Sequence, residues 1–135
     1  MAEKVWITIK GIRTMDGERE NVNEDGSGEY YRKNGKHYII WHHDGNIARR
    51  IGITENSMTV TESNGGNAMN FEKGTKTRTL YGTPGGKILL EIQTHDFCLR
   101  WEENLLEAEV DYSLFHDGSH ISDSRIKVTV CSQKV

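Results

Sequence analysis

The apolar residues of this chain recur at every second position over most of its length. In the segment KVWITIKGI, Val5, Ile7 and Ile9 share one face of an extended strand over residues 4–13. Successive side chains of a strand point to opposite faces, so each such set marks one inward face. No segment has the i, i+3, i+4, i+7 spacing of an amphipathic helix, and the sequence therefore predicts an all-β fold. The later sets are Ile47, Ile51 and Ile53; Met58 and Val60; Met69 and Phe71; Ile88, Leu90 and Ile92; Phe97, Leu99 and Trp101; Leu106, Ala108, Val110, Tyr112 and Leu114; and Ile126, Val128 and Val130.

Short turn motifs separate these apolar segments. They contain residue pairs that accept the positive φ angles of tight hairpins, so consecutive strands are expected to pair antiparallel as a meander. Closing the meander removes exposed strand edges, which favours a barrel of about 8–10 strands. The polar segment 14–28 is expected to be the one long connection, crossing an open end of the barrel. The turn motifs are Asn34-Gly35, Asp44-Gly45, Asn64-Gly65-Gly66, Pro84-Gly85-Gly86 and Asp117-Gly118.

Length and composition narrow the class of protein. With 135 residues the chain is expected to form a single β-barrel domain over residues 1–135. The net charge of -3, with basic residues spread among acidic ones, argues against nucleic-acid binding. No apolar run approaches the ~20 residues that span a bilayer, and the N-terminal segment has no apolar signal region, so we expect a cytoplasmic protein without membrane contact. Cys98 and Cys131 lack zinc-site spacing and are expected to be free thiols.

Two neighbouring histidines raise the question of a metal or acid–base site. In WHHDGN, His42 and His43 stand next to Asp44, before Gly45 turns the chain. Neighbouring side chains of a strand point to opposite faces, so His42 and His43 cannot both bind one ion unless a bulge intervenes. The segment is therefore interpreted as a strand end, and no metal ligand or cofactor is predicted.

Two further motifs resemble sites but fit hairpins better. GTPGGKI, residues 82–88, lacks the spacing and the helix of a phosphate-binding loop. In HDGSH, Asp117-Gly118 favours a two-residue hairpin that places His116 opposite Ser119 and His120 opposite Phe115. Neither motif predicts catalysis.

One charged residue lies in phase with the predicted core. Arg49 shares strand parity with Ile47, Ile51 and Ile53, so it is expected at the barrel mouth or facing a polar lumen, since an unpaired buried guanidinium is costly. Tyr81 and Tyr112 add hydroxyl groups on strand faces that can point inward, and Trp41 adds an aromatic ring near the strand end. A barrel of about eight strands can hold one small ligand. The candidate ligand-binding residues are therefore Arg49, Tyr81, Tyr112 and Trp41.

Several segments, in their order and spacing, resemble the YwiB-like family of bacterial proteins of unknown function. They include VWITIKGI, the pattern YY-x-K-x-G-K-x-Y-I at 30–39, and Tyr81-x-Thr83-Pro84-x-Gly86 followed by an apolar strand that ends at Thr94. The resemblance covers almost the whole chain and implies a calycin-like or lipocalin-like β-barrel. It implies no catalytic residues. Relatives tend to carry other residue types at Trp41, His42, His43 and Glu62, so a histidine site would be peculiar to this chain.

Three functions remain open at this point. The leading hypothesis is a non-enzymatic barrel that binds a small, partly apolar molecule in its interior or mouth. The second is a structural or interaction module, for example a homodimer that pairs through strand edges or exposed aromatics such as Trp6 and Tyr31. The third is a metal-dependent or acid–base enzyme that uses His42 and His43.

Overall fold

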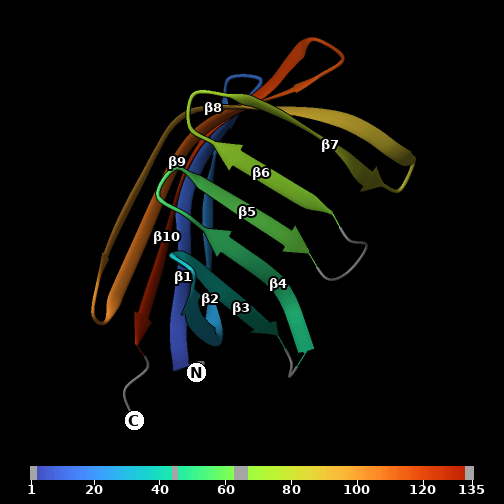
Figure 1. Ribbon diagram of the computed structural model, residues 1–135. Coiled ribbons are helices and arrows are strands. Elements are labelled where there is room, and N and C mark those ends of the chain that lie inside the picture. The colour runs from blue at the N-terminus through green and yellow to red at the C-terminus, as the bar shows by residue number, and fades with distance from the viewer. Residues whose placement is uncertain (1–2, 44–45, 63–66, 133–135) are drawn as a thin grey trace.

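Ten antiparallel strands make up the fold (Figure 1), which we describe from a computed structural model. The structure describes residues 3–43, 46–62 and 67–132, and only the backbone of residues 43, 46 and 47. The described residues contain no helix, and hence no helix that could cross a membrane. The strands are β1 (Glu3–Met15), β2 (Glu18–Lys33), β3 (Lys36–His43), β4 (Asn46–Ile53), β5 (Ser57–Glu62), β6 (Ala68–Glu72), β7 (Lys76–Thr83), β8 (Gly86–Glu102), β9 (Leu105–His116) and β10 (Ser119–Ser132).

The strands form one sheet that curls into a nearly closed barrel. The sheet order is β6-β5-β4-β3-β2-β1-β10-β9-β8-β7, so strands that follow each other in the chain pair, except β6 with β7, and β1 also pairs with β10. The end strands β6 and β7 meet through side chains: Thr77 Oγ1 donates to Asn70 O at 2.5 Å, and Thr79 Oγ1 donates to Ala68 O at 2.7 Å. The all-β prediction, the antiparallel meander and the expected strand number are thus confirmed.

The prediction that residues 14–28 form a long connection is wrong. Asp16 and Gly17, with φ angles of 51° and 77°, make a tight hairpin turn. Residues 18–33 then form β2, which pairs with β1 from Met15↔Glu18 to Glu3↔Tyr30. The ladder is made by backbone groups, so a polar sequence can form a strand wherever a neighbouring strand offers partners and solvent covers the side chains.

The other predicted turns are partly visible. Asn34 and Asp117 have positive φ angles of 54° each and are followed by Gly35 and Gly118, which confirms both hairpins. The β9–β10 register is also as predicted, with His116 opposite Ser119 and His120 opposite Phe115. The motifs Asp44-Gly45 and Asn64-Gly65-Gly66 lie outside the described residues.

Two glycines allow close packing on the inner side of β2. Gly28 lies opposite both Val5 of β1 and Trp41 of β3, and a Cβ there would stand 2.2 Å from the Ile40 carbonyl oxygen. Gly26 lies under the Trp41 indole, and a Cβ there would stand 2.8 Å from Trp41 Nε1. The strands of this wall can therefore approach one another closely only because these positions lack side chains.

Apolar residues fill the middle of the barrel. Ile7, Ile53, Ile92, Ala108 and Val110 have no exposed surface. The filled core leaves the two ends of the barrel as places where a ligand could enter. One end, here called the terminal end, carries the start of β1, the end of β10 and the β2–β3 and β8–β9 turns; the other, the hairpin end, carries the β1–β2, β7–β8 and β9–β10 hairpins (Figure 1).

Candidate functional site

Arg49 points into the barrel at the hairpin end, as its strand parity predicts. It lies opposite Trp41 of β3, which is buried, and on the same face of β4 as the buried Ile51 and Ile53. A bulge precedes it: the partner of Trp41 is Arg49, the partner of His42 is Ile47, and Ala48 is left without an opposite residue. Such a bulge changes the direction of the side chains that precede Ala48, but it leaves Arg49 on the face of β4 that points to the core. The side chain of Ile47 lies outside the described residues.

An ion pair and an aromatic ring hold the Arg49 guanidinium. Arg49 Nη1 donates to Glu24 Oε2 at 2.9 Å, and Nη2 donates to Glu24 Oε1 at 3.2 Å. The Arg49 Cζ atom lies 5.4 Å from the centre of the Trp41 ring, within range of a cation–π contact. The hydrogen bonds to Glu24 raise the pKa of Arg49 against the opposing effect of burial, so the guanidinium stays charged. A bidentate pair of this kind fixes the orientation of both side chains.

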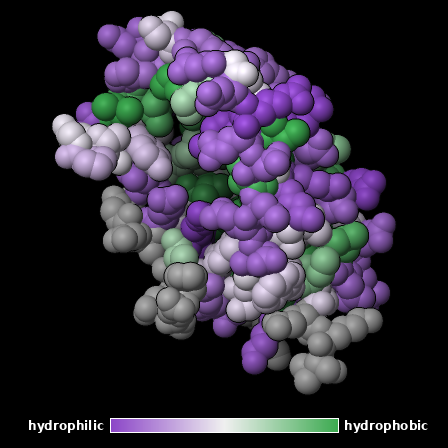
Figure 2. Space-filling view, turned by 180° about the vertical axis from the view of Figure 1, so that it is seen from behind, coloured by the Kyte–Doolittle hydropathy of each residue, from purple (hydrophilic) through white to green (hydrophobic). Residues whose placement is uncertain are grey.

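The mouth around Arg49 is hollow. A pocket of about 430 Å³ is lined by Glu24, Asp25, Trp41, Ala48 and Arg49. Partly buried apolar residues pack against the core, among them Val22, Ala48, Val60, Met69 and Leu114. Figure 2, a view from behind, shows a hollow beside the β7–β8 hairpin, with hydrophobic residues at its floor and hydrophilic residues along much of its rim. The mouth thus combines an apolar floor with charged and aromatic edges.

The two predicted tyrosines lie at different depths. Tyr81, on β7, is half-buried and close enough to Arg49 to add to the upward shift of the Arg49 pKa. Tyr112, on β9, is only 6% exposed, and its ring packs on Phe71 at 4.7 Å between centroids. The structure therefore brings Arg49, Trp41 and Tyr81 together at the mouth, and it places Tyr112 in the core beneath.

His42 has no distinctive chemical surroundings. Its Nε2 atom lies 4.0 Å from Glu29 Oε1, and its side chain is 31% exposed. The side chain of His43 lies outside the described residues, as does Asp44. Across residues 3–43, 46–62 and 67–132, no group of three or more His, Cys, Asp or Glu side chains could hold a metal ion. Cys98 and Cys131 are both free thiols, as predicted.

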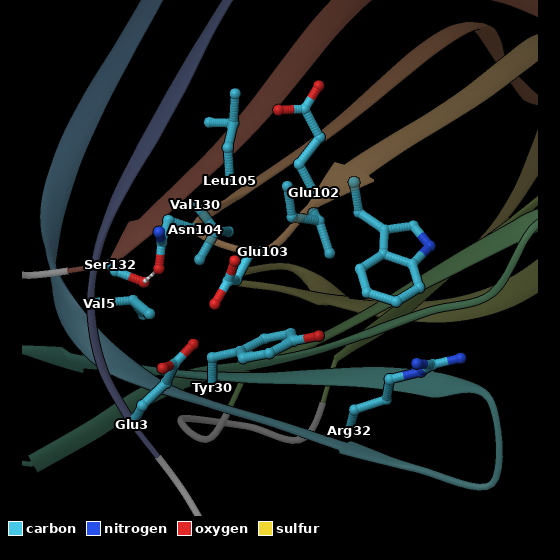
Figure 3. Close-up of a pocket in the computed structure, with 12 residues that line it drawn as sticks. Glu3, Val5, Tyr30, Arg32, Glu102, Glu103, Asn104, Leu105, Val130 and Ser132 are labelled. Atoms are coloured by element: carbon cyan, nitrogen blue, oxygen red, sulfur yellow. Dashed lines mark hydrogen bonds between the residues drawn. The ribbon is translucent and has the colours of Figure 1, made fainter.

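A second pocket, at the terminal end, was missed by sequence reasoning. It has a volume of about 210 Å³ and is lined mostly by apolar surface from Val5, Leu106 and Val130 together with aromatic rings. Its residues come from β1, β2, the β8–β9 hairpin and β10, which are far apart in the chain (Figure 3). No local motif could have revealed it. The remaining lining residues are Glu3, Tyr30, Arg32, Trp101, Glu102, Glu103, Asn104, Leu105 and Ser132.

A buried histidine supports the aromatic wall of this terminal pocket. His37 is 2% exposed, and its Nδ1 lies 2.7 Å from Tyr30 Oη, within hydrogen-bond distance. Burial, aided by the positive charge of Arg32, lowers the pKa of His37, so the neutral ring is favoured and Nδ1 can accept this bond. Trp101 packs edge-on against His37 at 5.0 Å and carries the Arg32 guanidinium on its face at 4.4 Å.

Four polar side chains on the outer face of β8, β9 and β10 form a cluster that the sequence reasoning also missed. His95 Nε2 lies 2.7 Å from Ser113 Oγ, Ser113 Oγ lies 2.5 Å from Asp123 Oδ1, and His120 Nε2 lies 2.8 Å from the same Asp123 oxygen. Bulges at His95 and Ile121 flank the cluster on either side of β9. Bulges shift the faces of the residues beside them, so an alternating pattern could not bring these four together.

The order of the hydrogen bonds in this cluster does not suit nucleophilic catalysis. Ser113 donates its single hydroxyl proton to Asp123, so His95 must donate to Ser113 rather than accept its proton. An activated serine needs the opposite arrangement, with a histidine base oriented by the carboxylate. Ser113 is also only 3% exposed. The hydrogen bonds from Ser113 and His120 lower the pKa of Asp123, and the cluster ties three strands together across two bulges.

Comparisons with known proteins agree with the observed fold. Residues 7–128 match the model of a family described as a domain of unknown function, DUF1934. The fold is similar to that in the crystal structure of the ywiB protein from Bacillus subtilis, with a TM-score of 0.83. The two chains are 19% identical over 98% of this chain and 94% of the other. A search of curated proteins finds no match.

Proposed function

Because the chain belongs to the DUF1934 family, whose function is unknown, we propose a function from the geometry of the barrel. The protein is a non-enzymatic binder of a small, partly apolar molecule, which enters the mouth at the hairpin end. The observation that carries this proposal is the hollow of about 430 Å³, in which Arg49 and Trp41 edge an apolar floor. Ligand pockets typically combine such apolar walls with a few fixed polar groups.

Each part of the mouth has a role in this proposal. The apolar part of the ligand is covered by partly buried residues that pack against the core, such as Val60, Met69 and Leu114, and water is released from it. Arg49, held in place by Glu24, and the Tyr81 hydroxyl supply hydrogen bonds to its polar part. A guanidinium fixed before binding loses little conformational entropy when a ligand arrives, which favours affinity.

The test uses the fluorescent probe 1-anilinonaphthalene-8-sulfonate, which is apolar with one anionic group. We expect the folded protein to enhance its fluorescence and the variant Arg49→Gln to bind it roughly threefold to tenfold more weakly, because a partly exposed charge contact contributes about 1 kcal/mol. The matched control is Arg50→Gln, since Arg50 is the next residue on β4 and faces the opposite, exposed side. Equal affinity in both variants, or no enhancement with the native protein, would refute the proposal.

A second function, an interaction module acting as a homodimer, draws on a different observation. Leu80 and Leu89 lie opposite each other on the outer side of the β7–β8 hairpin and are 61% and 46% exposed. Trp6, named above as a possible contact, is 42% exposed, whereas Tyr31 stacks on Tyr38 at 4.9 Å. Light scattering decides between the functions: a monomer at millimolar concentration removes the homodimer.

A further inference from the structure

The pocket at the terminal end differs from the mouth both in the residues that form its walls and in the charge of its rim. Its inner wall is apolar, formed by Val5, Leu106 and Val130. Its rim carries three carboxylates, of Glu3, Glu102 and Glu103, against the single guanidinium of Arg32. A carboxylate-rich rim around an apolar slot favours a positively charged guest over a negative one.

Two of the three rim carboxylates, those of Glu3 and Glu103, are directed at the opening, whereas the side chain of Glu102 extends away from it (Figure 3). Figure 3 shows the side chains of Glu3 and Glu103 extending toward each other across the pocket. Neither forms an ion pair with any residue in the described ranges 3–43, 46–62 and 67–132. A cation placed between these two carboxylates is attracted by both.

The aromatic wall already binds a cation. The Arg32 guanidinium lies 4.4 Å from the centre of the Trp101 ring, within the range of a cation–π contact. Trp101 nevertheless keeps 45% of its surface exposed, so the indole remains open to a further partner. The Tyr30 ring, on the neighbouring side of the pocket, adds a second aromatic surface.

The volume limits the size of the guest. About 210 Å³ exceeds the roughly 150 Å³ cavity that takes a benzene molecule, and it leaves room for a short arm beyond one ring. From this volume, the apolar wall and the carboxylate rim, we infer that the terminal pocket is a second binding site, for a small organic ammonium ion. The apolar body of the ligand lies against Val5, Leu106 and Val130, and its ammonium group lies between Glu3 and Glu103 beside Trp101. This site is separate from the mouth and does not depend on the function proposed for it.

The test compares three probes of one size and different charge, namely 2-phenylethylammonium, 2-phenylethanol and phenylacetate. Titration calorimetry on the full chain should show the ammonium binding roughly tenfold more tightly than the alcohol, and phenylacetate binding most weakly. Raising the salt concentration to about 1 M should weaken binding of the ammonium and leave the alcohol unchanged, because salt screens exposed charges.

Two variants locate the site. Glu103→Gln should weaken binding of the ammonium about threefold to fivefold without affecting binding of the alcohol. Trp101→Leu should weaken binding of the ammonium more than Glu103→Gln does, because it removes the aromatic ring while keeping an apolar side chain in place. The control is Glu20→Gln, since Glu20 is exposed on β2 near the β1–β2 hairpin, at the other end of the barrel. Circular dichroism confirms that each variant is folded.

Four results would overturn the inference. One is that the alcohol or phenylacetate binds as tightly as the ammonium. Another is that Glu103→Gln and Glu20→Gln bind the ammonium as tightly as the native chain. A third is that the ammonium does not bind at millimolar concentration. Since Arg49→Gln should leave ammonium binding unchanged, loss of the ammonium in that variant would also assign the probe to the mouth instead.

Discussion

Replacement of Gly28 by alanine tests whether close packing of β1, β2 and β3 shapes this barrel. Gly28 faces the core between Val5 and Trp41. An alanine Cβ would stand 2.2 Å from the Ile40 carbonyl oxygen and 2.7 Å from Ile7 Cδ1. The first contact is with backbone, so β3 must move away from β2, and the displacement also reaches Trp41 at the mouth.

The size of the effect follows from two opposing contributions. Overpacking a tight site costs about 1–3 kcal/mol, and a clash with backbone belongs at the upper end of that range. Alanine also lowers the conformational entropy of the unfolded chain, which stabilises the folded state by about 0.4–1 kcal/mol. The free energy of unfolding should therefore fall by about 2 kcal/mol, which for a chain of this length lowers Tm by roughly 8 °C.

Gly52→Ala is the matched control. Gly52 lies on β4, and its added Cβ would meet only the flexible end of Lys36, with Cε at 2.8 Å. Neither Gly28 nor Gly52 has a positive φ angle, so alanine fits both backbones. Urea unfolding followed by circular dichroism should show Gly52→Ala as stable as the native protein, or about 0.5 kcal/mol more so. A loss under about 0.5 kcal/mol in Gly28→Ala, or an equal loss in both variants, would refute the packing argument.

Two further predictions concern pH and the seam of the barrel. Burial and the charge of Arg32 lower the pKa of His37 below 6.5, so its contribution to stability is present above pH 6.5 and is lost as pH falls toward the folded pKa. The native chain should thus lose more stability between pH 7.5 and pH 5.5 than His37→Phe does in urea unfolding, and equal losses would contradict this account. Thr79→Val removes the hydrogen bond from Thr79 Oγ1 to Ala68 O at the seam. It should cost about 1 kcal/mol and speed amide hydrogen exchange in β6 and β7, whereas unchanged protection would mean that the bond does not hold the seam.

Most of the fold could be predicted because its signals are local. Alternation of apolar residues sets which side chains face inward, and pairs such as Asn34-Gly35 set the hairpins, because both depend on the backbone geometry of a few neighbouring residues. The position of Arg49 followed from the same alternation. The prediction for residues 14–28 was wrong because their polar side chains do not alternate with apolar ones, although most of these residues form a strand whose partners lie on β1.

The sequence by itself determined an antiparallel all-β meander with its inward faces. Only the tertiary structure decided where chemistry can occur. Bulges at Ala48, His95 and Ile121 shift strand faces, and no local pattern marks them. The terminal pocket joins Glu3 and Val130 with the β8–β9 turn only after β1 pairs with β10. Closure of the sheet brings residues from opposite ends of the chain into contact, and that pairing depends on the whole fold rather than on any single segment.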